Sequence, residues 1–358
     1  MNDNKRSWIQ TNAITIDNSM VYCVDKLTRK IIVISLVNKT IEYTIEFPDC
    51  VTIPEDNRSF LFIYGGSISF IPNTESVLYV WKENKNDWES HSLSDEYNKG
   101  FYLYSQGRIV GDYLYLFPFT GKNYVKYDLL DNRVESIWNI FAPLQMEFSH
   151  EFESINAPAW VDESHIVGCI SANNAIYTVD LLNLSIKYHY FDKSGCMIST
   201  LVVIGDSLIL CDKRNHALYR VNKSNMEITR EYGYGNKRAK ITSINSNLFL
   251  LEEIDTGAFY ILNEDFDVIW KNTEALSDGN GVTDGSGIVT YGENIGYYYN
   301  MFSKKIYIVY ENAQIEVSDV IRELDVSLLK SKIDISREMF KESVFFGVND
   351  FINLVADC

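Results

Sequence analysis

Positively charged side chains gather in short loops that the sequence predicts between strands. They are Lys26, Arg29, Lys122, Lys213, Arg214, His216 and Lys304. Ammonium and guanidinium groups bind carboxylates and phosphates through charge-assisted hydrogen bonds. Each of these loops occupies the same place in a repeating unit, so a radial arrangement of the units would set the seven residues around one end of a central channel. This pattern predicts a site for an anionic ligand, with ordinary solvated loop charge as the alternative interpretation.

Carboxylates accompany these cations. Asp25, Glu75, Asp212 and Asp255 lie in or beside the same loops and would cancel part of the positive charge. The whole chain carries a formal net charge of -17 at pH 7, and such a field repels nucleic acid and anionic membranes. We therefore expect a protein partner or a small anionic ligand, and neither nucleic acid nor a membrane.

Catalytic and metal-binding motifs are not evident. The five histidines lack ligand spacing, the six cysteines form no CxxC pair, and neither a GxSxG elbow nor a phosphate-binding glycine loop occurs. We predict no metal, no cofactor and no catalytic residue. Acidic residues are numerous enough for glycoside hydrolysis, although the sequence does not pair them in space.

Alternating apolar segments with an aromatic centre recur along the chain, as expected for strands. They start at residues 30, 77, 123, 175, 217, 258 and 305, and recur every 41 to 52 residues. The third position is tyrosine in five of them, with Ile32 and Val125 as exceptions: Tyr79, Tyr177, Tyr219, Tyr260 and Tyr307. Each segment is therefore predicted to be the third strand of a repeated unit.

Turn residues complete the unit. A tight-turn pair such as Gly65-Gly66, Gly111-Asp112 or Gly205-Asp206 lies 12 or 13 residues before each segment, and an apolar residue such as Trp88 or Val134 follows it. Four strands in a repeat of this length indicate a β-propeller blade. We predict an all-β, seven-bladed propeller of four-stranded antiparallel blades. Two β-sandwiches, or six or eight blades, are the alternatives, and the mode of ring closure stays open.

The second unit, SVLYVWKENKNDWESHSL, resembles the end of a kelch repeat: Tyr79 lies in a strand, a polar turn follows, and Trp88 opens the last strand. VKYDLLDNRV in the third unit is a weaker version. The kelch Gly-Gly at the end of the second strand is replaced by pairs such as Val24-Asp25 and Ile71-Pro72. The resemblance implies a kelch-like propeller with degenerate repeats.

The pattern changes near the C-terminus. We assign residues 1–317 to the propeller and 318–358 to a helical extension, in which Phe340, Val344, Val348, Phe351 and Val355 follow helical spacing. That helix packs on the propeller or docks a partner. The N-terminus has no apolar signal region, and Cys23, Cys169 and Cys211 lie in apolar strands where a free thiol is at home, so a cytoplasmic location is expected.

The sequence is compatible with two functions. The leading hypothesis is a non-catalytic binding scaffold that presents the loops around the channel. The alternative is a carbohydrate-active hydrolase or lyase with its site at the channel mouth. An enzyme should gather carboxylates, histidines or arginines in a pocket there, whereas a scaffold should expose aromatic residues such as Tyr97, Tyr102 and Phe119.

Overall fold

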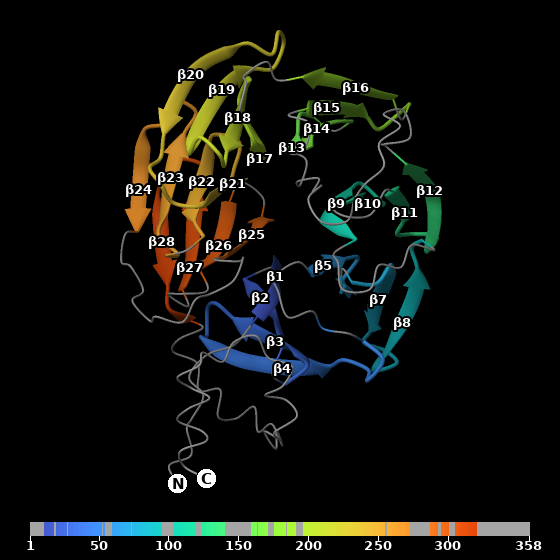
Figure 1. Ribbon diagram of the computed structural model, residues 1–358. Coiled ribbons are helices and arrows are strands. Elements are labelled where there is room, and N and C mark those ends of the chain that lie inside the picture. Colours follow the sequence, from blue (N-terminus) through green and yellow to red (C-terminus); the bar gives the residue numbers. More distant parts are fainter. Residues whose placement is uncertain are drawn as a thin grey trace, which may run out of the picture.

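The computed structural model describes most of the strand-forming chain. The described residues are 11–17, 19–26, 28–51, 53, 59–72, 74–94, 103–118, 123–139, 159–162, 164–170, 175–183, 185–190, 196–254, 256–272, 287–292, 295–300 and 305–320. Their strands form seven sheets of four antiparallel strands each, arranged as the blades of a ring (Figure 1). The predicted all-β, seven-bladed propeller is confirmed.

Each blade is a run of four strands that follow one another along the chain. Blades 1 and 2 hold β1 (Thr11–Asp17), β2 (Met20–Asp25), β3 (Lys30–Ser35), β4 (Thr40–Glu46), β5 (Phe60–Tyr64), β6 (Ser67–Ile71), β7 (Val77–Lys82) and β8 (Asp87–Ser92). Blades 3 and 4 hold β9 (Tyr104–Val110), β10 (Tyr113–Pro118), β11 (Asn123–Asp128), β12 (Arg133–Asn139), β13 (Ala159–Trp160), β14 (His165–Ile170), β15 (Ala175–Asp180) and β16 (Ser185–Tyr190).

The remaining three blades follow the same order. Blades 5 and 6 hold β17 (Ile198–Ile204), β18 (Ser207–Asp212), β19 (Ala217–Asn222), β20 (Ile228–Gly233), β21 (Ala239–Ser243), β22 (Leu248–Glu253), β23 (Phe259–Asn263) and β24 (Val268–Asn272). Blade 7 holds β25 (Gly287–Gly292), β26 (Ile295–Asn300), β27 (Lys305–Tyr310) and β28 (Ile315–Ser318). The repeated aromatic segments are the third strands. Gly65, Gly66, Gly111 and Gly205 take positive φ in the turns between the first and second strands of their blades.

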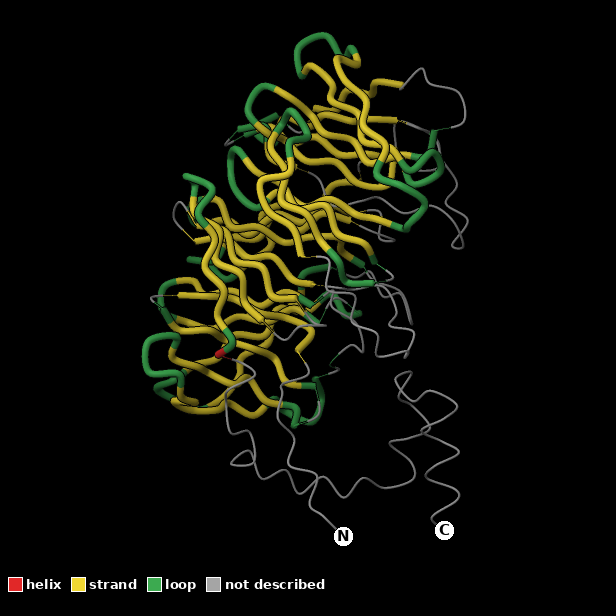
Figure 2. Tube along the Cα trace, turned by 90° about the vertical axis from the view of Figure 1, so that its left-hand side faces the viewer, coloured by secondary structure: helices red, strands yellow, loops and turns green. Residues whose placement is uncertain are grey.

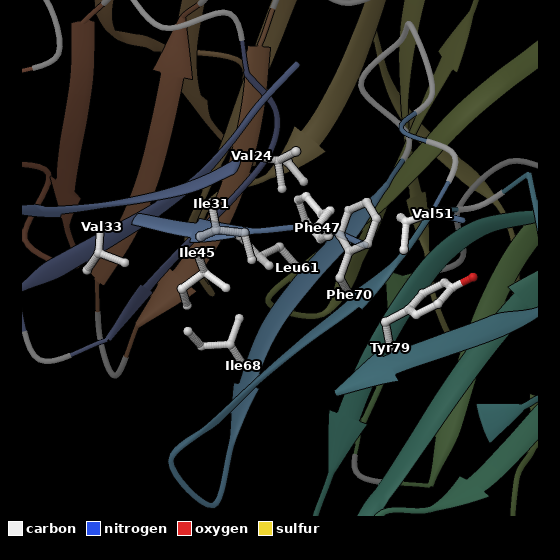
Figure 3. Packing of buried hydrophobic residues seen from close by; sticks show 11 residues of the cluster. Val24, Ile31, Val33, Ile45, Phe47, Val51, Leu61, Ile68, Phe70 and Tyr79 are labelled. Carbon is white, nitrogen blue, oxygen red and sulfur yellow. The ribbon is translucent and has the colours of Figure 1, made fainter. Parts of the chain in front are cut away.

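The core is divided among the spaces between blades. Seven clusters of buried apolar residues each join one blade to the next. Between blades 1 and 2, for example, Val24, Ile31 and Val33 pack near Ile68 and Phe70 (Figure 3). Seen from the side, strands fill the middle of the blades and turns lie at their two ends (Figure 2). Each blade is covered on both faces by its neighbours. Residues that point to either face of a strand are therefore buried.

Among the described strands, the first and last blades meet by packing, and neither contributes a strand to the other. The first and last blades each consist of four consecutive strands. Ile14, Cys23 and Ile32 of blade 1 contact a cluster that includes Tyr299 and Ile306 of blade 7. Val320, just beyond β28, is fully buried in the same cluster. The closing interface is therefore built like the other six.

The antiparallel order gives every blade two distinct ends. The loops between second and third strands share one end with the connections between blades, and we call this the loop end. The turns between first and second and between third and fourth strands lie at the opposite, turn end. No helix among the described residues is long and apolar enough to cross a membrane. The predicted C-terminal helix, beyond residue 320, lies outside the described residues.

Candidate functional site at the loop end

The predicted cations fall on loops of two described blades. Lys26 and Arg29 lie in the β2–β3 loop of blade 1, and Lys213, Arg214 and His216 form most of the β18–β19 loop of blade 5. Blades 6 and 7 separate these two loops in the ring (Figure 1). The structure therefore brings three of the residues together on one loop and places two on another. Lys122 and Lys304 lie outside the described residues.

A buried carboxylate holds the backbone of the β18–β19 loop. Asp212 is fully buried, and its Oδ1 accepts hydrogen bonds from the backbone N–H groups of Met197, Arg214 and Asn215 at 3.0, 3.0 and 3.1 Å. Its Oδ2 accepts from Asn215 Nδ2 at 2.7 Å and from the Tyr219 hydroxyl at 3.2 Å. Burial alone would raise the pKa of Asp212, but hydrogen bonds, including one from the Cys196 thiol, lower it to about 2. Asp212 is thus ionised and fixes the loop.

The same device recurs in blades 1 and 6. Buried Asp25 accepts from the backbone N–H and the hydroxyl of Thr28 at 3.1 and 2.5 Å. In blade 6, Glu253 accepts from the Thr256 hydroxyl at 2.7 Å and the Tyr260 hydroxyl at 3.4 Å. Acids at the ends of second strands therefore accept hydrogen bonds from groups of the loop that follows, as Asp side chains do in tight turns.

The repeated tyrosine of the third strand supports these loops. Tyr219 donates to Asp212, Tyr260 to Glu253, and Tyr79 to Glu75 at 3.2 Å. The sequence identified the tyrosine as a repeat marker without this role. It also interpreted Asp25 and Asp212 as charges that cancel the cations, whereas both are buried and bonded to loop groups. Asp255 lies outside the described residues.

Three cations remain exposed on these fixed loops. Arg29, Lys213 and Arg214 are exposed, and none of them forms an ion pair with a carboxylate of the described residues. Arg29 takes φ 53 and donates from Nη2 to the Val51 carbonyl at 2.7 Å, which orients its guanidinium. His216 is less available, because its Nδ1 donates to the Lys237 carbonyl at 3.2 Å.

A second polar cluster lies at the loop end between blades 6 and 7. Glu252 is only 1% exposed; one carboxylate oxygen accepts from the Tyr298 hydroxyl, and the other lies 3.1 Å from Lys240 Nζ. Asn300 Nδ2 donates to the Tyr298 hydroxyl at 2.9 Å and to the Gly257 carbonyl at 3.1 Å. Lys240 lies on the innermost strand β21 and is partly exposed. This arrangement places a buried carboxylate beside an ammonium group at the loop end of the ring.

Sequence reasoning missed this cluster because its members come from three strands in two blades. One signal was available for Asn300: it ends the second strand of blade 7, at the position where blades 1, 5 and 6 have Asp25, Asp212 and Glu253. Among the described residues, no group of three histidine, cysteine or acidic side chains could hold a metal ion. The aromatic candidates Tyr97, Tyr102 and Phe119 lie outside the described residues.

Comparison with known proteins places the chain among β-propellers. No protein-family model and no curated protein matches it. Among solved structures, virginiamycin B lyase from Staphylococcus aureus is similar over 86% of this chain and 96% of its own, with a TM-score of 0.57 and 13% identity.

Two further structures are similar at the same level. BamB from Moraxella catarrhalis gives a TM-score of 0.51 and 11% identity, over 86% of this chain and 83% of its own. The C-terminal WD40 domain of Sif2 gives a TM-score of 0.51 and 10% identity, over 85% of this chain and 82% of its own. Likeness at these identities concerns the fold, and a kelch type for the repeats stays a prediction.

Proposed function

We propose that this protein is a non-catalytic binding scaffold whose loop end receives an acidic protein surface or a small anionic ligand. One observation carries the proposal: Arg29, Lys213 and Arg214 are exposed on loops that buried acids fix, and no described carboxylate pairs with them. In a chain of net charge -17, these exposed side chains carry charge of the opposite sign to the average field of the protein.

Fixed loops favour recognition for an entropic reason. The bonds from Asp212 to its own loop hold the backbone that carries Lys213 and Arg214. A ligand that binds them then orders only two side chains, which lowers the entropic cost of binding. Guanidinium groups also match carboxylate and phosphate oxygens in pairs, so Arg29 and Arg214 suit an acidic partner.

The surrounding acidic field adds selectivity. A local positive site on an acidic protein orients an anionic partner at the loop end, because the average field of the rest of the protein repels that partner. The WD40 domain of Sif2 and BamB support a scaffold by likeness of fold alone, since propellers host enzymes as well. The proposal extends to a cytoplasmic location and to a partner contact by residues 318–358.

Affinity capture from the native host tests the proposal. Full-length bait is compared with a Lys213→Glu plus Arg214→Glu variant, and with a Lys85→Glu plus Arg133→Glu control that reverses two exposed charges away from the loop end. We expect one specific partner or ligand to be lost with the first variant and kept with the second. Equal recovery with both variants contradicts a loop-end site. A bait truncated before Ser336 then shows whether the C-terminal segment takes part.

The enzyme alternative is favoured by buried Glu252 with partly exposed Lys240 beside it at the loop end, and by the fold of the lyase. A hydrolase or lyase acting on carbohydrate would use this carboxylate. Glycoside and uronide substrates are assayed with wild type, Glu252→Gln and, as a control, Glu135→Gln at an acid paired with Arg133 away from the loop end. Turnover that Glu252→Gln alone abolishes would replace the scaffold proposal.

A further inference from the structure

A pocket of about 210 Å³ opens at the turn end, between blades 4 and 5. Val161, Leu208 and Met226 form apolar walls, and Thr178, His165 and Lys223 supply its polar groups. The walls belong to the turns after β13 and β19 and to the start of β18. This pocket is on the opposite side of the ring from the loop end, so the proposed scaffold function does not use it.

The size and lining of the pocket favour a small apolar body. A cavity of about 150 Å³ lined by aliphatic side chains can hold benzene, so this one has room for a ring and a short chain. Met226 is flexible and polarisable, and can adapt to different shapes. Apolar contact then supplies most of the binding free energy.

Donors for a negative group are present at the same pocket. Lys223 Nζ donates to the Gly205 carbonyl at 2.7 Å, and its nearest carboxylate, Asp206, is 3.8 Å away and fully exposed. An ammonium group has three donors, so Lys223 keeps hydrogen-bonding capacity. The Thr178 hydroxyl makes no hydrogen bond to any described residue and is a second donor.

Two further acids near this pocket, Asp162 and Asp180, form hydrogen bonds within their own turns. Asp162 accepts from the backbone N–H groups of Ser164 and His165, both at 2.8 Å, and from His165 Nδ1 at 2.9 Å. Asp180 accepts from the Leu182 N–H at 2.9 Å and from Asn183 Nδ2 at 2.6 Å. These bonds commit both carboxylates to turns, which reduces their repulsion of an incoming anion.

We propose that this pocket binds a small amphipathic carboxylate. Its apolar part packs on Val161, Leu208 and Met226, and its carboxylate accepts hydrogen bonds from Lys223 and Thr178. A carboxylate next to an apolar group also occurs at the C-terminus of a peptide that ends in an apolar residue. We assign the site to the free acid, because the pocket has room for one ring and a short chain.

The test uses the full chain with 3-phenylpropionate, and 3-phenylpropan-1-ol as its uncharged match. Binding is followed by calorimetry and by the methyl resonance of Met226, assigned with Met226→Leu; the other methionines serve as internal references. We expect the acid to shift the Met226 resonance and to bind about tenfold more tightly than the alcohol. Lys223→Met and Thr178→Val should each weaken the binding of 3-phenylpropionate. Lys85→Met, in the equivalent turn of blade 2, should leave that binding unchanged.

Several outcomes would overturn the assignment. Equal binding of acid and alcohol, an unmoved Met226 resonance, or full binding by Lys223→Met each contradicts it. Binding by a peptide that ends in phenylalanine, without binding by the free acid, would make the site a peptide site and also contradicts it. If Lys223→Met does not fold, Thr178→Val and the alcohol comparison decide.

Discussion

The hydroxyl of Tyr219 donates a hydrogen bond to the carboxylate of Asp212 at 3.2 Å, and both side chains are fully buried. This bond joins the residue that marks the repeat to the residue that fixes the loop. The third strand of blade 5 thus supports the backbone that displays Lys213 and Arg214.

Asp212→Asn should remove an acid-dependent part of the stability. The folded-state pKa of Asp212 is about 2, below the ordinary 3.8, so its contribution is complete above about pH 5 and is lost as the pH falls towards 2. That contribution is about 2 kcal/mol. Urea unfolding across this range should show wild type and variant converging at low pH. Asp206→Asn changes a fully exposed acid of the same blade, and its free energy of unfolding should follow that of wild type at every pH.

Tyr219→Phe and Tyr177→Phe should have opposite consequences, although both tyrosines are fully buried at the same repeat position. Tyr219→Phe removes a hydrogen bond to a charged acceptor and should lower the free energy of unfolding by about 1.5–3 kcal/mol. The Tyr177 hydroxyl lies near that of Tyr124, and no carboxylate of the described residues accepts a hydrogen bond from either. Tyr177→Phe should therefore be neutral or stabilising. Equal losses in denaturant unfolding would contradict the pairing described for Tyr219.

The repeat could be predicted because strand alternation and turn residues are local properties of the sequence. The burial of individual charges could not be predicted, because it depends on the neighbouring blade. The sequence suggested that Asp25 and Asp212 are loop charges, and only the packed sheets show that they are buried hydrogen-bond acceptors. Glu252 was missed for the same reason, since its hydroxyl donor Tyr298 comes from the next blade. The pocket beside Lys223 likewise exists only where two blades meet.

Gly168→Ala should strain the interface that contains Tyr177. Gly168 and Tyr177 are paired across β14 and β15, and a Cβ at residue 168 would lie 2.3 Å from the tyrosine hydroxyl and ring. The fully buried ring has no room to move, so the variant should lose about 1–3 kcal/mol. Gly233→Ala is the control, because nothing lies within 4 Å of its Cβ position. A Gly168→Ala, Tyr177→Leu double variant should recover part of the loss, which thermal unfolding can measure.

Arg220→Met should loosen the contact between blades 5 and 6. Arg220 Nε donates to the Ser207 hydroxyl at 2.9 Å, while its terminal nitrogens lie 2.6 Å from Asp265 and 3.0 Å from Glu264 in the β23–β24 turn. A network of this kind contributes more than an isolated surface pair, and we expect a loss of about 1–2 kcal/mol at low salt.

Salt separates this electrostatic role from simple packing. The ion pairs of Arg220 are partly exposed, so screening by molar salt should bring variant and wild type closer together in urea unfolding. Arg133→Met is the matched control: Arg133 pairs with Asp131 and Glu135 within one blade and is 62% exposed, so its removal should change little. A salt-independent loss in Arg220→Met would show that its methylenes, and not its charge, join the two blades.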